Sequence, residues 1–184
     1  MSRLDELNVL ARSFDKSAVV LVKEDSWFMK FLNIFVRVFN KKFMTEYTIT
    51  IANRVYMTRA NMDRECGYLI AHEVGGHVRQ CRYFGFGIHP WVGFLFYMIA
   101  YLFLVFPTQA AYLRYRLELA ADAVAWRYAL DHGMTADWVR ARAVAFANKV
   151  SSWDYFQSWP DGWTLWGFQR KAEKVIQKWS AEHV

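Results

Sequence analysis

The hydrophobic and polar positions change their period along the chain, from strand-like in the first third to helical in the rest. Residues 18–22 form a short β-branched apolar run, and residues 47–51 and 54–58 read as two further strands joined by a turn. From about Asp63 onward the apolar positions recur at helical spacing. The pattern therefore predicts an α+β fold that is mainly helical, with a small N-terminal β-sheet.

Capping residues and helix breakers mark where the expected helices begin and end. Asp25 and Ser26 can cap a helix, Thr135 can cap another, and Gly85 and Gly133 stand where two helices should stop. The expected helical ranges are 26–39, 63–85, 108–131, 135 onward and 164–181. No linker rich in Pro, Gly or Ser interrupts the 184 residues, so we expect one domain over residues 1–184.

The sequence HEVGGH, residues 72–77, carries the candidate chemistry inside the expected helix 63–85. Two imidazoles, His72 and His77, beside the carboxylate of Glu73 indicate a zinc site for hydrolysis. In a regular helix, residues five apart diverge by about 140°, so both rings could not reach one ion. A π-bulge absorbs one extra residue in a turn, and Gly75 and Gly76 stand where it must form. We therefore expect a π-bulge between the two histidines.

A catalytic zinc site needs a third protein ligand and an open position. Glu118 is the best candidate, because it lies in the middle of the expected helix 108–131, and Asp122 shares its face four residues later. His89 offers another imidazole, but it precedes a proline in a loop full of breakers, where a turn residue is the simpler interpretation. The site is therefore expected to combine two histidines of one helix with a glutamate of the next.

The H-E-x-x-x-H spelling resembles that of the dipeptidyl peptidase III family of zinc peptidases, and the downstream Glu-x-x-x-Asp is similar to the pattern of small gluzincin-type metallopeptidases. The resemblance implies that His72, His77 and Glu118 bind Zn²⁺ and that Glu73 is the catalytic residue acting on water. It further implies that Asp122 orients a ligating histidine. The implied protein is a zincin-like zinc metallopeptidase that hydrolyses a peptide or protein substrate.

Two features of charge and hydropathy point toward other partners. The net charge is +6, and Lys30 and Arg37 interleave with phenylalanines in the expected helix 26–39. That helix could rest on a membrane or an acidic partner, although an apolar face on the core and a solvated basic face is the simpler interpretation. No nucleic-acid-binding motif is present, so nucleic acid is not an expected partner.

The apolar stretch 90–113 contains no charged side chain and is long enough to cross a bilayer once. One crossing would separate the histidines from Glu118 by about 30 Å of hydrocarbon, so we expect a buried or interfacial helix that could make peripheral membrane contact. The first residues are charged and lack an apolar signal region, and Cys66 and Cys81 lie too far apart on a helix to pair. We therefore expect a cytoplasmic protein, with membrane association as the alternative.

Two alternatives to a peptidase remain at this level. One is a membrane-associated protein in which the histidines are incidental. The other is a partner-binding protein that keeps zinc in a structural or inactive site. The sequence gives no indication of the oligomeric state.

Overall fold

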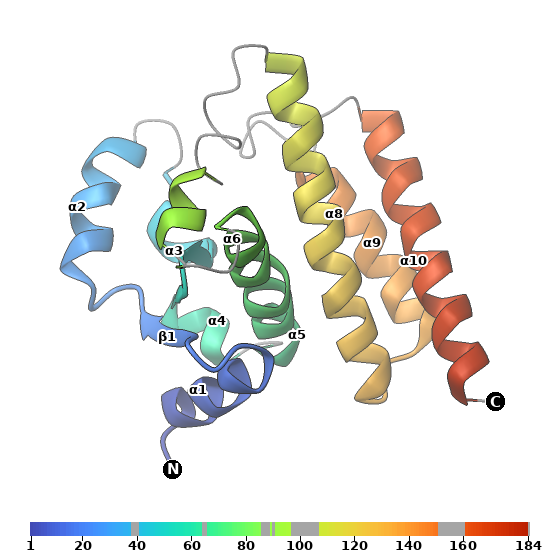
Figure 1. The fold of residues 1–184 in the computed structure, drawn as a ribbon, viewed down its shortest axis with the longest axis horizontal. Coiled ribbons are helices and arrows are strands. Elements are labelled where there is room, and N and C mark those ends of the chain that lie inside the picture. Colours follow the sequence, from blue (N-terminus) through green and yellow to red (C-terminus); the bar gives the residue numbers. More distant parts are fainter. Residues whose placement is uncertain are drawn as a thin grey trace. The chain divides into compact units, whose positions relative to one another are not determined.

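The computed structural model describes residues 1–37, 41–63, 66–85, 89, 91–96, 107–150 and 161–183. The chain divides into two compact units, Met1–Phe96 and Tyr97–Val184. The first unit combines helices with a three-stranded sheet, and the described part of the second is helical (Figure 1). This confirms the α+β, mainly helical fold expected from the sequence, whereas the single domain stays a prediction.

The first unit contains the sheet and the helices around it (Figure 1). Its elements are α1 Arg3–Phe14, β1 Val19–Val22, α2 Trp27–Val36, α3 Phe43–Glu46, β2 Ile49–Ile51, β3 Arg54–Met57, α4 Arg59–Asp63, α5 Cys66–Ile70, the π-helix η1 Ala71–Val78 and α6 Arg79–Phe84. Strand β3 is central and pairs in parallel with β1 and antiparallel with β2. All three strands expected from the sequence are confirmed.

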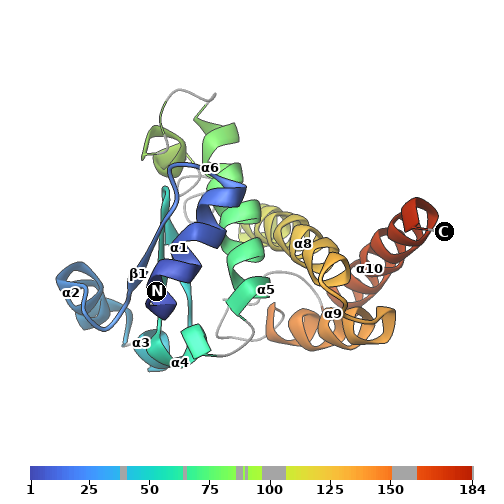
Figure 2. The ribbon, with the colours of Figure 1, turned by 90° about the horizontal axis from the view of Figure 1, so that it is seen from below.

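Helices cover both faces of this sheet, with α2 on one side and α1 and the α5–η1–α6 segment on the other (Figure 2). Successive side chains of a strand point to opposite faces. Val55 and Met57 therefore pack in the cluster that includes residues of α1 and η1. Ile51 and Tyr56 point the other way and pack with Met29 of α2. The sheet thus supports η1 through one face and α2 through the other.

Helix α1 was not among the expected elements. Ser2 caps it, because its hydroxyl accepts a hydrogen bond from the backbone N–H of Asp5, and the Asp5 carboxylate accepts one in return from the backbone N–H of Ser2. This reciprocal capping box is a signal that the sequence carries. The inner face of α1 buries Leu7 and Ala11 against the sheet and η1.

The second unit contains α8 Pro107–Asp131, α9 Ala136–Val150 and α10 Asp161–His183 (Figure 1). Trp126 of α8 and Phe168 of α10 are fully buried, with ring centroids 6.0 Å apart. The hydroxyl of Thr135 accepts a hydrogen bond from the backbone N–H of Trp138, as expected of an N-cap, and Gly133 has a φ of +86° just beyond the end of α8. The expected helix ends on both sides of this turn are confirmed.

Part of the apolar stretch 90–113 lies outside the described residues, which resume at Pro107 as the start of α8. The expected end of the helix 26–39 also lies outside them, since α2 is described to Val36. A membrane-spanning helix, one both long and apolar enough to cross a bilayer, is not found in the described parts of the chain.

Candidate metal centre

The HEVGGH segment forms the π-helix η1, and all eight of its residues are buried. Hydrogen bonds in a π-helix run between residues five apart, so side chains five apart come to the same side as those four apart do in an α-helix. His72 and His77 have this separation. Gly75 and Gly76 lie in the widened turn between them. The structure confirms the expected π-bulge and extends it over two turns.

The imidazoles of His72 and His77 face each other through the same type of nitrogen. Their Nε2 atoms lie 3.2 Å apart, and the ring planes stand at 79° to each other. Two nitrogens that each lie about 2.05 Å from a tetrahedral zinc are about 3.3 Å apart. The observed separation therefore fits two ligands of one metal ion.

Gln80 orients one of these rings from the first turn of α6. Its side-chain Oε1 lies 3.0 Å from Nδ1 of His77, so Nδ1 donates the hydrogen bond and Nε2 keeps its lone pair toward His72. Such a contact to the second ring nitrogen fixes the tautomer of a metal-binding histidine. The spacing of three residues between His77 and Gln80 is the sequence signal that indicates such a contact.

The third expected ligand belongs to the same cluster. His72, His77 and Glu118 each offer one ligand atom, and these atoms lie within 4.8 Å of one another. All three side chains are buried. The three residues could therefore hold a metal ion, and the candidate ligand set read from the sequence is brought together.

Glu73 is buried beside these residues but is not part of the metal-binding group that the described residues form. Its Oε2 accepts a hydrogen bond of 2.6 Å from the hydroxyl of Thr50, which lies in the middle of β2. Thr50 faces η1 because its neighbours Ile49 and Ile51 point to the opposite face of the sheet. A strand thus fixes the position of the carboxylate proposed to act on water.

Lys23 is a fully buried cation that interacts electrostatically with Glu73. Its ammonium group donates hydrogen bonds to the backbone carbonyl oxygens of Phe43 and Tyr47, the second at 2.7 Å. Burial lowers the pKa of Lys23 to about 8, although the negative charges of Glu73 and Glu24 act in the opposite direction. No sequence pattern indicates the burial of Lys23, because a single lysine after a strand is ordinarily solvated.

The two remaining candidates from the sequence, Asp122 and His89, differ in burial. Asp122 is completely buried, as a carboxylate serving a metal site would be, and its role toward a histidine stays a prediction. His89 is exposed, and its Nδ1 accepts a hydrogen bond from the backbone N–H of Trp91 at 3.3 Å. The backbone oxygen of His89 also accepts a hydrogen bond from the N–H of Gly93 at 3.1 Å, so His89 makes local contacts with the residues that follow it.

Known proteins do not add to this picture. Neither protein-family models, nor curated proteins, nor solved structures give a match to the chain. The interpretation of the site accordingly depends on the geometry and chemistry of its own residues.

Proposed function

We propose that this protein is a zinc-dependent metallopeptidase whose metal is held by His72, His77 and Glu118. The observation that carries the proposal is the 3.2 Å separation of the two histidine Nε2 atoms on a π-helix, with a glutamate oxygen in the same group. Two imidazoles and one carboxylate form a ligand set used by catalytic zinc, whereas structural zinc usually takes four ligands and favours cysteine. The buried Cys81 is not part of the group.

The side chains of this centre divide the work of hydrolysis. When bound there, zinc supplies a Lewis acid that polarises a substrate carbonyl and lowers the pKa of a coordinated water. Glu73 accepts a proton from the attacking water and returns it to the leaving amine. Thr50 holds Oε2 of Glu73 by the 2.6 Å hydrogen bond, so that the carboxylate keeps one orientation. Gln80 holds His77, and Asp122 is assigned to orient a ligating histidine.

The substrate class in this proposal is a peptide or protein, as the resemblance to gluzincins implies. Burial supports hydrolysis over simple metal storage, because a carboxylate in a low-dielectric site beside a metal is suited to proton transfer. The competing possibility is a partner-binding protein with a structural or inactive zinc site. A peptidase needs Glu73 as a base and a partner-binding protein does not, so a substitution of Glu73 distinguishes the two possibilities.

The deciding experiment measures metal content and hydrolysis on the same preparations. Purified protein is analysed for bound metals beside the variants His77→Ala and Glu118→Ala, with His132→Ala, an exposed histidine, as the matched control. We expect stoichiometric zinc in the wild type and the control, and loss of zinc in the two ligand variants. A wild-type protein loaded under zinc that holds no stoichiometric metal would overturn the proposal.

Hydrolysis is then tested with a mixture of unstructured peptides whose cleavage is followed by mass spectrometry. Glu73→Gln keeps the shape of the side chain but removes the base, so zinc should stay bound while cleavage falls by about a thousandfold. If the wild type and Glu73→Gln both bind zinc and neither cleaves a peptide, the zinc site is structural or inactive and the protein is a binding module.

A further inference from the structure

Helix α2 has apolar side chains on its outer side as well as on its inner side. Met29 is completely buried against the sheet, as expected of a core position. Trp27, Phe31, Ile34 and Phe35 point away from the core, with 76%, 52%, 60% and 59% of their surfaces exposed. A helix that is apolar all round is normally covered on every side. The outer side of α2 therefore calls for a partner that the described residues of the first unit do not provide.

The exposed side chains form one continuous stripe. At about 100° per residue, Trp27, Phe31, Ile34 and Phe35, together with Phe28, fall within an arc of about 120°. Met29, Leu32 and Val36, which pack in the core cluster around Ile51 and Tyr56, occupy the opposite side. We call the five exposed residues the α2 stripe. Contiguous exposed apolar surface of this kind marks an interaction site.

Positive charge borders the α2 stripe along one edge. Lys30 and Arg37 are exposed and lie at similar angles on the helix, next to Ile34. Within the described part of the chain, neither makes an ion pair with an acidic group. Helix α2 itself contains no Asp or Glu. The surface thus combines aromatic and aliphatic side chains with cations that have no acidic partner on their own element.

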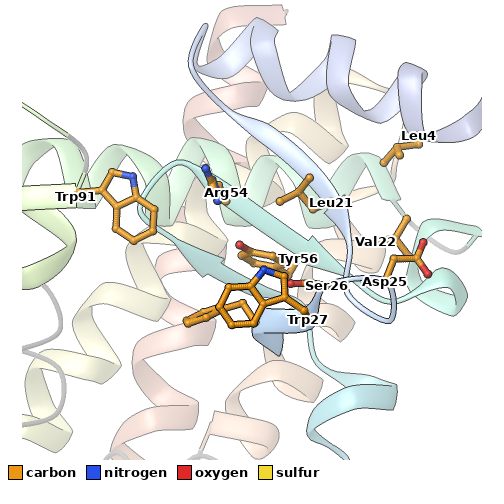
Figure 3. A pocket seen from close by; sticks show the side chains of 10 residues that line it. Leu4, Leu21, Val22, Asp25, Ser26, Trp27, Arg54, Tyr56 and Trp91 are labelled. Carbon is orange, nitrogen blue, oxygen red and sulfur yellow. The ribbon is translucent and has the colours of Figure 1, made fainter. Parts of the chain in front are cut away.

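A pocket of about 500 Å³ opens beside the first turn of α2. Trp27 and Phe28 of the stripe form part of its wall, and Leu21 and Tyr56 of the sheet form another part (Figure 3). Arg54, which is exposed, also lines it, with its guanidinium group 5.7 Å from the ring centre of Trp91. Asp25 also lines the pocket, but its carboxylate is paired with Arg59 at 2.8 Å. A largely apolar hollow with the cation of Arg54 beside it suits an amphiphile that has an acyl chain and an anionic headgroup.

Two occupants of the α2 stripe can be compared by charge. A second copy of this chain, packed through the same stripe, would offer Lys30 and Arg37 no acidic group from its own α2, because that helix contains no Asp or Glu. The cations would then lose hydration without gaining a counter-charge from the helix that they face. An anionic lipid surface instead offers hydrocarbon to the stripe and phosphate or carboxylate groups to the cations. Tryptophan at position 27 also suits the boundary between hydrocarbon and headgroups.

We propose that the α2 stripe, bordered by Lys30 and Arg37 and adjoining the pocket at Arg54, docks the protein peripherally on an anionic lipid membrane. The stripe inserts to the depth of the headgroup boundary, and the cations stay at the level of the phosphates. This inference is independent of the metal centre, because it depends on residues of α2 and its pocket alone.

The test is co-sedimentation with vesicles of phosphatidylcholine that contain about 30% phosphatidylserine, beside vesicles of phosphatidylcholine alone. The double variant Phe31→Ser, Ile34→Ser should lower the partition coefficient on anionic vesicles by at least about tenfold. The matched control is Trp163→Ser, Trp166→Ser, which removes two exposed aromatic side chains of the second unit, 68% and 55% exposed, and should leave binding unchanged. Thermal unfolding checks that each variant is folded.

The charged border has its own variant, Lys30→Glu with Arg37→Glu. This variant should abolish the preference for anionic over neutral vesicles. Raising the salt from about 0.05 to 0.5 M should likewise weaken the binding of the wild type to anionic vesicles. No binding to either kind of vesicle would overturn the proposal. The stripe would instead be assigned to a second copy if the wild type does not bind vesicles and is a dimer in light scattering, whereas the Phe31→Ser, Ile34→Ser variant is a monomer.

Discussion

The hydroxyl of Thr50 donates a hydrogen bond of 2.6 Å to Oε2 of Glu73, and so joins the middle of β2 to the π-helix. Thr50→Val keeps the shape of the side chain and removes this bond. Because hydrogen bonds to charged groups contribute about 1.5–3 kcal/mol, we expect a loss of about 2 kcal/mol in the free energy of unfolding, measured with urea. Peptide cleavage should fall with zinc content unchanged. Thr50→Ser restores the hydroxyl and should recover both; a variant as stable and active as the wild type would show that the bond has no role.

Lys23 gives stability an unusual dependence on pH. Its pKa is about 8 in the folded protein, against 10.5 as the ordinary value, so between these values the unfolded chain binds more protons. The free energy of unfolding therefore receives a contribution that rises with pH from about 8 to 10.5, by up to about 3 kcal/mol.

Urea unfolding of the wild type and of Lys23→Met across this pH range measures that contribution. Burial raises the pKa of the Cys81 thiol to about 12, which acts in the opposite direction above about pH 9 but is present in both proteins. The difference between the two curves should therefore isolate Lys23. Lys30→Met, at an exposed position, is the control and should leave the curve unchanged in shape. Parallel curves for Lys23→Met and the wild type would contradict the prediction.

Deleting Gly75 should convert the π-turn into an α-turn. The histidines would then be four residues apart, and α5 and α6 would keep their register, because a π-bulge is one residue added to an otherwise regular helix. We expect zinc still to bind, within roughly tenfold of the wild-type affinity, when titrated by calorimetry. Inserting an alanine after Gly76 is the control, since histidines six apart should not share an ion. Loss of folding on deletion would show that the glycine pair serves packing instead.

Gly93 lies where the chain has no room for a side chain. A Cβ atom at this position would approach the carbonyl oxygen of Cys81 to 1.6 Å, so Gly93→Ala must displace backbone. We expect a loss of about 2–3 kcal/mol in the free energy of unfolding. Leu95→Ala, two residues away at a side chain that is 60% exposed, should change it by about 0.5 kcal/mol or less. Equal effects of the two substitutions would contradict the close approach.

Structural features that depend on residues close together in the sequence could be predicted from the sequence. The π-helix follows from two glycines between histidines five apart, and β1, β2 and β3 follow from short β-branched runs. The N-cap at Thr135 and the turn at Gly133 depend on backbone chemistry within a few residues. Such local rules act wherever the segment lies, which is why they could be read without the fold.

Other features depend on residues that the chain brings together over long separations. Thr50 and Glu73 are 23 positions apart, and only the pairing of β2 with β3 and the packing of η1 on that sheet decide that they meet. The burial of Lys23 under the carbonyl groups of Phe43 and Tyr47 arises in the same way. No local pattern encodes these contacts, because a threonine in a strand and a lysine after one are common everywhere.

Helix α2 shows the difference most clearly. The sequence by itself determined a helix over 26–39 that is rich in apolar side chains, since capping and periodicity are local, and α2 confirms it over Trp27–Val36 with Ser26 as its cap. It could not determine which of those side chains face the core. The tertiary structure decided this by burying Met29 against the sheet and leaving Phe31 and Ile34 outside, because one face of the sheet can cover only one side of a helix.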